Sequence, residues 1–182
     1  MGREDELYRQ YLAGNPSAGD QLMLYLGDQL TGYLYAFVHN TQDSEDLMLD
    51  CFSEILVRKP KIREGCFRAY LFRMARYKAN RLWRLRLKRK EFTLEEAQAS
   101  REHSPEEKAK ANERSAVLNR CLNRIAPQYR EALWMVYEMD MSYSQAATVL
   151  GCGNKRVEDL LRNGKKRLRL ELEKEGITRA DL

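Results

Sequence analysis

Residues 66–90 read CFRAYLFRMARYKANRLWRLRLKRK, and this stretch decides how the chain folds. It contains neither Gly nor Pro, and its apolar side chains recur every three or four residues. That spacing predicts one long helix with an apolar stripe for core packing. A second stripe at the same spacing mixes cations with rings and an amide: Tyr70, Arg73, Tyr77, Asn80, Arg84 and Lys88.

Charge is strongly segregated around this helix. Fourteen Lys or Arg and one acid lie between Arg58 and Lys90, whereas the first 57 residues carry ten acids and two bases. A run this unbalanced repels itself unless a counter-charge is present, which favours a polyanionic partner. Cations neutralise phosphates and exposed rings stack on unpaired bases, so the second stripe predicts nucleic-acid binding. The alternative is a solvated basic face that happens to carry two tyrosines.

The preceding segment is expected to form an acidic helix that begins near Asp43, the predicted N-cap, and ends near Arg58 before Pro60. One side of this helix carries Glu45, Asp46, Asp50 and Glu54. Acids in a first turn favour the helix dipole without any partner. A surface that docks on a basic protein is an equal alternative.

The composition favours helix throughout, and no alternating strand pattern of useful length appears. We therefore predict an all-α protein with two small helical domains, residues 1–90 and 116–182, joined by a charged linker at 91–115. Ser104-Pro105-Glu106-Glu107 within this linker is typical of a helix start. An earlier amphipathic helix is expected around residues 22–37.

The second domain has the outline of a helix-turn-helix. Ser142 and Gln145 predict a capping box, Gly151-Cys152-Gly153 predicts a tight turn, and a long basic helix follows from about Asn154 to Glu173. An earlier helix from Pro127 is expected to turn Tyr129, Leu133, Val136 and Tyr137 inward. Seven bases against two acids between Asn154 and Arg169 favour DNA binding over a plain helical hairpin.

Several function classes find no support in the residues. The chain carries no glycine-rich phosphate loop, no nucleophile motif and no Cys-x-x-Cys pair, so we expect neither an enzyme nor a cofactor or metal protein. Cys51, Cys66, Cys121 and Cys152 are expected to be free thiols in a reducing cytoplasm. No apolar stretch is long enough to span a bilayer, and the acidic N-terminus does not look like a secretion signal.

Two stretches resemble conserved region 2 of extracytoplasmic-function sigma factors. Residues 43–52, DSEDLMLDCF, are similar to the family pattern D-x-E-D-L-x-Q-E-x-F, and residues 67–76, FRAYLFRMAR, are similar to F-R-A-W-L-Y-R-I-A-R. The second block, from Leu122 to Leu168, resembles region 4 of the same family. Some positions depart from the pattern, including Leu49 for Gln, Tyr77 for Asn, and Arg156-Val157-Glu158-Asp159-Leu160 for T-V-K-S-R.

The resemblance implies a factor that binds core RNA polymerase, directs it to promoters and helps to melt the −10 element. It places polymerase contacts at Glu45, Asp46, Asp50 and Phe52. It places −10 DNA contacts at Lys61, Arg63, Tyr70, Arg73, Arg76, Tyr77, Asn80 and Arg84. It places −35 DNA contacts at Lys155, Arg156, Arg162, Asn163 and Lys166.

Promoter DNA and core polymerase are thus the expected partners, and an anti-sigma factor is a further candidate. Two alternatives remain open from the sequence. One is a helix-turn-helix transcriptional regulator without polymerase docking, and the other is a helical adaptor whose basic face binds acidic protein. The acidic helix separates the first alternative from a sigma factor, because only a sigma factor needs it.

Overall fold

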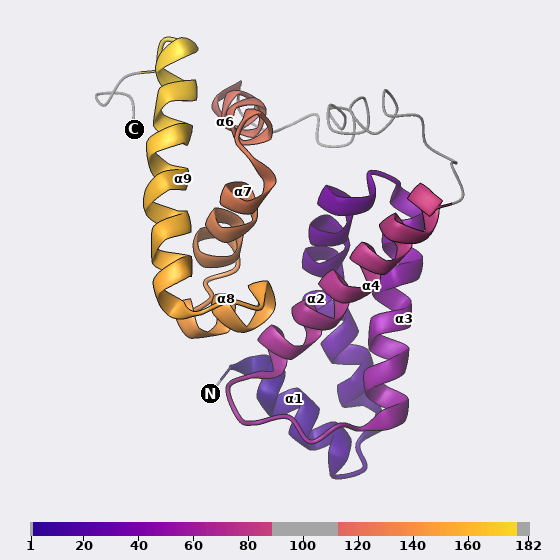
Figure 1. The fold of residues 1–182 in the computed structure, drawn as a ribbon. Coiled ribbons are helices and arrows are strands. Elements are labelled where there is room, and N and C mark those ends of the chain that lie inside the picture. The colour runs from indigo at the N-terminus through magenta and orange to yellow at the C-terminus, as the bar shows by residue number, and fades with distance from the viewer. Residues whose placement is uncertain (1, 89–112, 178–182) are drawn as a thin grey trace. The chain divides into compact units, whose positions relative to one another are not determined.

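A computed structural model describes residues 2–88 and 113–177, and the regular structure within them is helical. The chain divides into two compact units, Met1–Ala97 and Gln98–Leu182 (Figure 1). The all-α prediction is confirmed. The helix start predicted at Ser104 and most of the predicted linker lie outside the described residues, so the domain boundaries stay predictions. Among the described helices, each is too short or too polar to cross a lipid bilayer.

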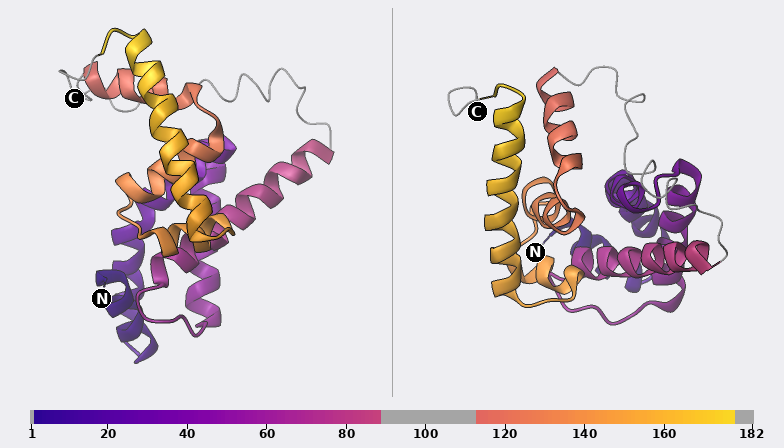
Figure 2. Two further views of the ribbon diagram at one scale, coloured as in Figure 1. Left: turned by 60° about the vertical axis from the view of Figure 1, so that its left-hand side comes forward. Right: turned by 45° about the horizontal axis from the view of Figure 1, so that its top comes forward.

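The first unit is built around one long apolar helix. Helix α2 (Pro16–Val38) packs against α1 (Arg3–Leu12), α3 (Thr41–Arg58) and α4 (Phe67–Lys88). Its side chains at four-residue spacing are fully buried: Leu22, Leu26, Leu30 and Leu34. Helix α4 is continuous over its described length, as the sequence predicts (Figure 2).

The start of α3 differs from the prediction. Asn40, not Asp43, is the N-cap, and its Oδ1 accepts a hydrogen bond from the Asp43 amide at 2.9 Å. Helix α3 therefore begins two residues before the predicted cap, and the Asp43 carboxylate pairs instead with Arg86 of α4 at 2.5 Å. The end of α3 is as expected: Lys59 adopts a left-handed conformation with φ 47°, and Pro60 follows.

The second unit contains α6 (Glu113–Arg124), α7 (Pro127–Leu133), a π-helical turn η1 (Trp134–Glu138), α8 (Tyr143–Leu150) and α9 (Asn154–Lys174). The predicted capping box is confirmed, because Ser142 Oγ accepts from the Gln145 amide and Gln145 Oε1 accepts from the Ser142 amide. Gly164 lets α9 approach α7 closely, since a Cβ there would lie 3.3 Å from Leu133 and Tyr129.

Tyr137 was predicted to face inward, and this is wrong. Its side chain is 56% exposed, and Lys165 Nζ lies 4.7 Å from the centre of its ring. The π-helical turn explains the error, because its wider winding changes the direction of side chains that a regular helix would place in register. Met135, in the same turn, is the residue that is fully buried.

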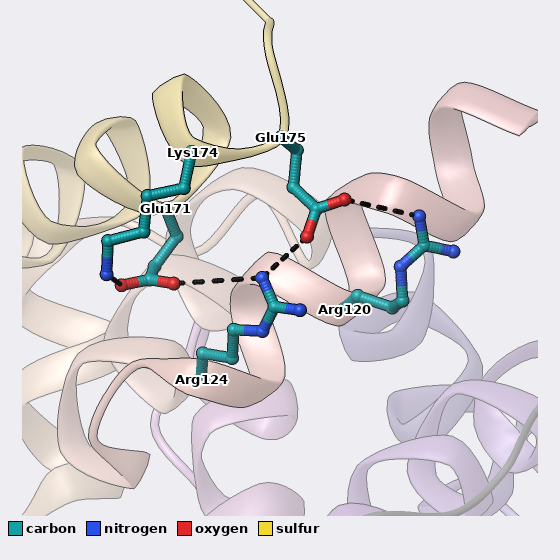
Figure 3. A network of polar contacts seen from close by, with 5 residues as sticks. All are labelled: Arg120, Arg124, Glu171, Lys174 and Glu175. Carbon is teal, nitrogen blue, oxygen red and sulfur yellow. Dashed lines mark hydrogen bonds and ion pairs between the residues drawn. The ribbon is translucent and has the colours of Figure 1, made fainter.

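Ion pairs join α6, the first described helix of the second unit, to the end of α9. Arg124 of α6 lies 2.6 Å from Glu175 and 3.9 Å from Glu171, while Arg120 lies 3.5 Å from Glu175 (Figure 3). Hydrogen bonding from Arg124 lowers the pKa of Glu175. These charged groups are open to solvent, which screens the pairs, so the buried residues Cys121, Ile125 and Leu172 supply most of the packing.

Candidate nucleic-acid and protein interfaces

One face of α4 presents the side chains predicted to contact DNA. Tyr77 is 68% exposed, Tyr70, Arg73 and Arg84 are exposed, and Arg76 and Asn80 are half-buried. From Tyr70 to Arg84 this stripe is about 20 Å long at 1.5 Å per residue, which suits several consecutive nucleotides.

The loop between α3 and α4 leads into the N-terminal end of α4. Lys61 and Arg63 are exposed on the loop. The Cys66 amide donates a hydrogen bond to the Arg63 carbonyl at 3.0 Å, and Gly65 takes a φ of 74° in that turn. Lys61 and Arg63 therefore lie on an exposed loop that leads directly into the helix carrying Tyr70 and Arg73.

Other cations of α4 already have carboxylate partners within the first unit. Lys78 Nζ lies 2.5 Å from Asp50 and 2.7 Å from Glu54, and Arg68 Nε lies 3.0 Å from Glu4. Burial lowers the pKa of Lys78, but its hydrogen bonds to Asp50 and Glu54 outweigh that effect, so the pKa of Lys78 is raised overall. The hydrogen bond from Lys78 lowers the pKa of Glu54. The acids of α3 thus supply part of the counter-charge that the sequence seemed to lack.

The acidic side of α3 also contains both exposed surface acids and acids bonded to α4. Glu45 and Asp46 are exposed, whereas Asp50, also at the surface, is engaged by Lys78. Phe52, predicted as a polymerase contact, has 0% of its surface exposed. We correct that assignment, because a side chain within the core cannot touch a partner without unfolding the helix that carries it.

Sequence reasoning did not single out two large apolar side chains that are exposed on the same helix. Leu49 is 48% exposed and Val57 is 79% exposed. Leu49 stands where the sigma factor pattern has Gln, which was its signal in the sequence. The two side chains lie eight residues apart on α3 and do not form a continuous patch, and isolated apolar side chains are ordinary at protein surfaces, so we assign them no contact.

The outward face of α9 carries the residues predicted for the second DNA contact. Lys155, Arg156, Asn163 and Lys166 are exposed. Arg162 is exposed too, but it pairs with Asp159 at 2.6 Å on the same helix. Two acids, Glu158 and Asp159, would repel phosphate on this face. The pair with Arg162 offsets the charge of Asp159, whereas Glu158 is exposed.

Both units match known protein families. Residues 22–89 match Sigma-70 region 2, and residues 115–168 match Sigma-70, region 4. The chain belongs to the sigma-70 family. This sigma factor is of the extracytoplasmic-function group, as its region 4 match and its structural neighbours indicate, so the predicted family is confirmed.

Two solved structures resemble this sigma factor over most of its length. CnrH, solved in complex with the cytosolic domain of CnrY, is 25% identical with a TM-score of 0.65, over 93% of this chain and 97% of CnrH. The sigma factor RpoE from Bartonella quintana, solved in complex with the anti-sigma factor NepR, is 20% identical with a TM-score of 0.64, over 85% and 96%. A comparison with curated proteins found no match.

Proposed function

We propose that this RNA polymerase sigma factor opens the −10 element with the exposed stripe of α4 and reads the −35 element with the first half of α9. Glu45 and Asp46 of α3 dock on core RNA polymerase in this proposal. The observation that carries it is the division of α4 into two faces. Cations that face α1 and α3 are bonded to carboxylates, whereas Tyr70, Arg73, Tyr77 and Arg84 are turned to solvent.

The exposed stripe has the chemistry that strand opening needs. Melting requires a site that binds unpaired bases more tightly than paired ones. Tyrosine rings do so by stacking, which contributes about 1–3 kcal/mol per base. Arg73 and Arg84 lie on the same stripe, where they can neutralise the phosphates of the captured strand.

Replacing Tyr77 with alanine tests the melting assignment. We expect about tenfold less open complex on a closed duplex promoter, because one stacking surface is lost. The defect should be smaller on a template with a pre-melted bubble, since strand separation is already complete there. Tyr77→Phe keeps the ring and should retain most activity. Permanganate footprinting of unpaired thymines measures the open complex, and equal signals for Tyr77→Ala and the parent would contradict the assignment.

A pair of substitutions on α9 tests the −35 assignment. Arg156 lies in the first turn of α9, where recognition helices usually touch bases, and paired bonds from Arg to guanine discriminate by about 1–3 kcal/mol. We expect Arg156→Ala to relax the sequence preference, and Lys166→Ala to weaken binding about equally on all sequences. Selection from duplex DNA randomised in the −35 region measures both. An unchanged preference in Arg156→Ala would remove α9 as the reader.

The runner-up function is a helix-turn-helix regulator that does not dock on polymerase. It uses only the second unit, and it leaves the region 2 match at residues 22–89 without a purpose. Retention of the chain on immobilised core polymerase separates the two functions.

We further propose that an anti-sigma factor binds this chain. CnrH was solved with the cytosolic domain of CnrY, and RpoE was solved with the anti-sigma factor NepR. The chain would act in the cytoplasm, where polymerase meets promoter DNA. Both matched regions belong to sigma factors, which are not enzymes, so we assign the chain no reaction of its own.

A further inference from the structure

Helix α1 is bonded to both ends of the loop that carries Lys61 and Arg63. Before the loop, Tyr8 Oη donates to the Pro60 carbonyl at 2.7 Å, whereas Tyr11 Oη donates to the Leu56 carbonyl at 3.0 Å inside α3, away from the loop. After the loop, Asp5 Oδ1 accepts from the Phe67 amide at 3.2 Å. The connection between α3 and α4 runs alongside α1 (Figure 1).

The contacts at the two ends are partly buried. Tyr8 is a core residue whose ring lies 4.9 Å from that of Phe67. Burial raises the pKa of Tyr8 to about 12, so its hydroxyl stays protonated and able to donate at physiological pH. Glu4 is also buried and pairs with Arg68 at the start of α4. Removing one partner of a buried ion pair is strongly destabilising, so the Glu4–Arg68 pair fixes the start of α4 against α1.

The middle of the loop is different. Lys61, Arg63 and Glu64 are exposed, and they lie between the Pro60 carbonyl, which accepts from Tyr8, and the Phe67 amide, which donates to Asp5. Helix α1 therefore holds the two ends of a short segment and leaves its charged centre turned to solvent. Fixing the ends of a short loop restricts the conformations of its centre, which reduces the entropy lost when that centre binds a ligand.

We propose that α1 is a positioning helix for −10 recognition: Tyr8 and Asp5 hold the Lys61–Gly65 loop in the conformation that receives the non-template strand. These two residues act through the loop and do not touch DNA. The inference rests on the proposed role of the loop in −10 binding. It adds a role for the N-terminal helix, which lies before the region 2 match that begins at residue 22.

Trypsin digestion of the full chain tests the first half of the proposal without DNA. The enzyme can cut after Lys61 and Arg63, while Pro60 protects the bond after Lys59. We expect Tyr8→Phe and Asp5→Ala to speed cleavage at these two sites about threefold to tenfold, as the loss of one hydrogen bond allows. Tyr11→Phe is the matched control: it also deletes one hydroxyl from α1, but the bond lost is to Leu56 within α3, and cleavage should stay within about twofold of the parent.

Binding of single-stranded DNA tests the second half. The factor in complex with core polymerase selects from single-stranded oligonucleotides randomised over the −10 positions, and the selected pools are sequenced. We expect Tyr8→Phe and Asp5→Ala to flatten the base preference, while their thermal midpoints and polymerase affinities stay close to those of Tyr11→Phe. A general loss of stability would lower the thermal midpoint without changing which bases are preferred.

Two results would overturn the inference. A double variant of the loop itself distinguishes a failure of this inference from a failure of the proposed function. Parental cleavage rates in both Tyr8→Phe and Asp5→Ala would show that α1 does not order the loop. Faster cleavage with an unchanged base preference would show that loop order does not matter for recognition. Lys61→Ala with Arg63→Ala should also alter DNA selection; if it does not, the loop has no role in −10 binding and the proposed function fails at that point.

Discussion

Glu45→Lys combined with Asp46→Lys is expected to abolish binding to core RNA polymerase. Both side chains are exposed on the first half of α3, so their replacement leaves the core unchanged. Like charges brought together at an interface cost several kcal/mol, which corresponds to a loss of affinity of about 100-fold or more. Fluorescence anisotropy of labelled factor titrated with core enzyme measures the effect.

The choice of residues and of control follows from the structure. Asp50 is left intact, because a lysine at that position would face Lys78 and weaken the contact of α3 with α4. Asp20→Lys with Asp28→Lys makes the same charge change on α2, in the same unit and also at the surface. This control should bind polymerase nearly as well as the parent. Equal affinities for the two double variants would show that α3 is not the docking helix.

Phe52→Ala is expected to destabilise the first unit by about 3–5 kcal/mol, the usual range for removing a buried phenylalanine ring. The effect arises because the buried ring loses its packing contacts and leaves a cavity beneath α3. Hydrogen exchange of the α2 and α3 amides measures it without interference from the second unit.

Phe52→Leu distinguishes core packing from direct contact. It keeps much of the buried volume, so the fold should survive at a smaller cost, and polymerase affinity should be close to that of the parent. If Phe52 did contact polymerase, Phe52→Leu would weaken binding far more than its small effect on hydrogen exchange accounts for. That outcome would restore the residue to the docking surface.

Local patterns predicted most of the helices, because the signals are carried by residues close together in the chain. The capping box needs only Ser142 and Gln145, and the turn before α9 needs only Gly151 and Gly153. The N-cap of α3 was mistaken because Asn40 and Asp43 are both good caps three residues apart, and local preference does not choose between them. Tyr137 was mistaken because a count by 3.6 residues fails across a π-helical turn.

The sequence predicted which residues lie on the functional surfaces, but not which of the basic residues are bonded to carboxylates within the protein. The exposed stripe of α4 follows from helical spacing alone, as does the outward face of α9. The bonds from Lys78 to Asp50 and from Arg86 to Asp43 join residues 28 and 43 positions apart. No local pattern encodes such contacts. The sequence therefore could not distinguish basic side chains exposed for DNA binding from those bonded to carboxylates within the protein.

The internal pairing of α4 sets how many small ions the protein exchanges when it binds DNA. Each cation that replaces a counterion on single-stranded DNA contributes about 0.7 to the slope of log affinity against log salt concentration. Arg68, Lys78 and Arg86 have carboxylate partners already, so they displace few ions from the strand. The first unit should therefore show a shallower salt dependence than its count of basic residues implies.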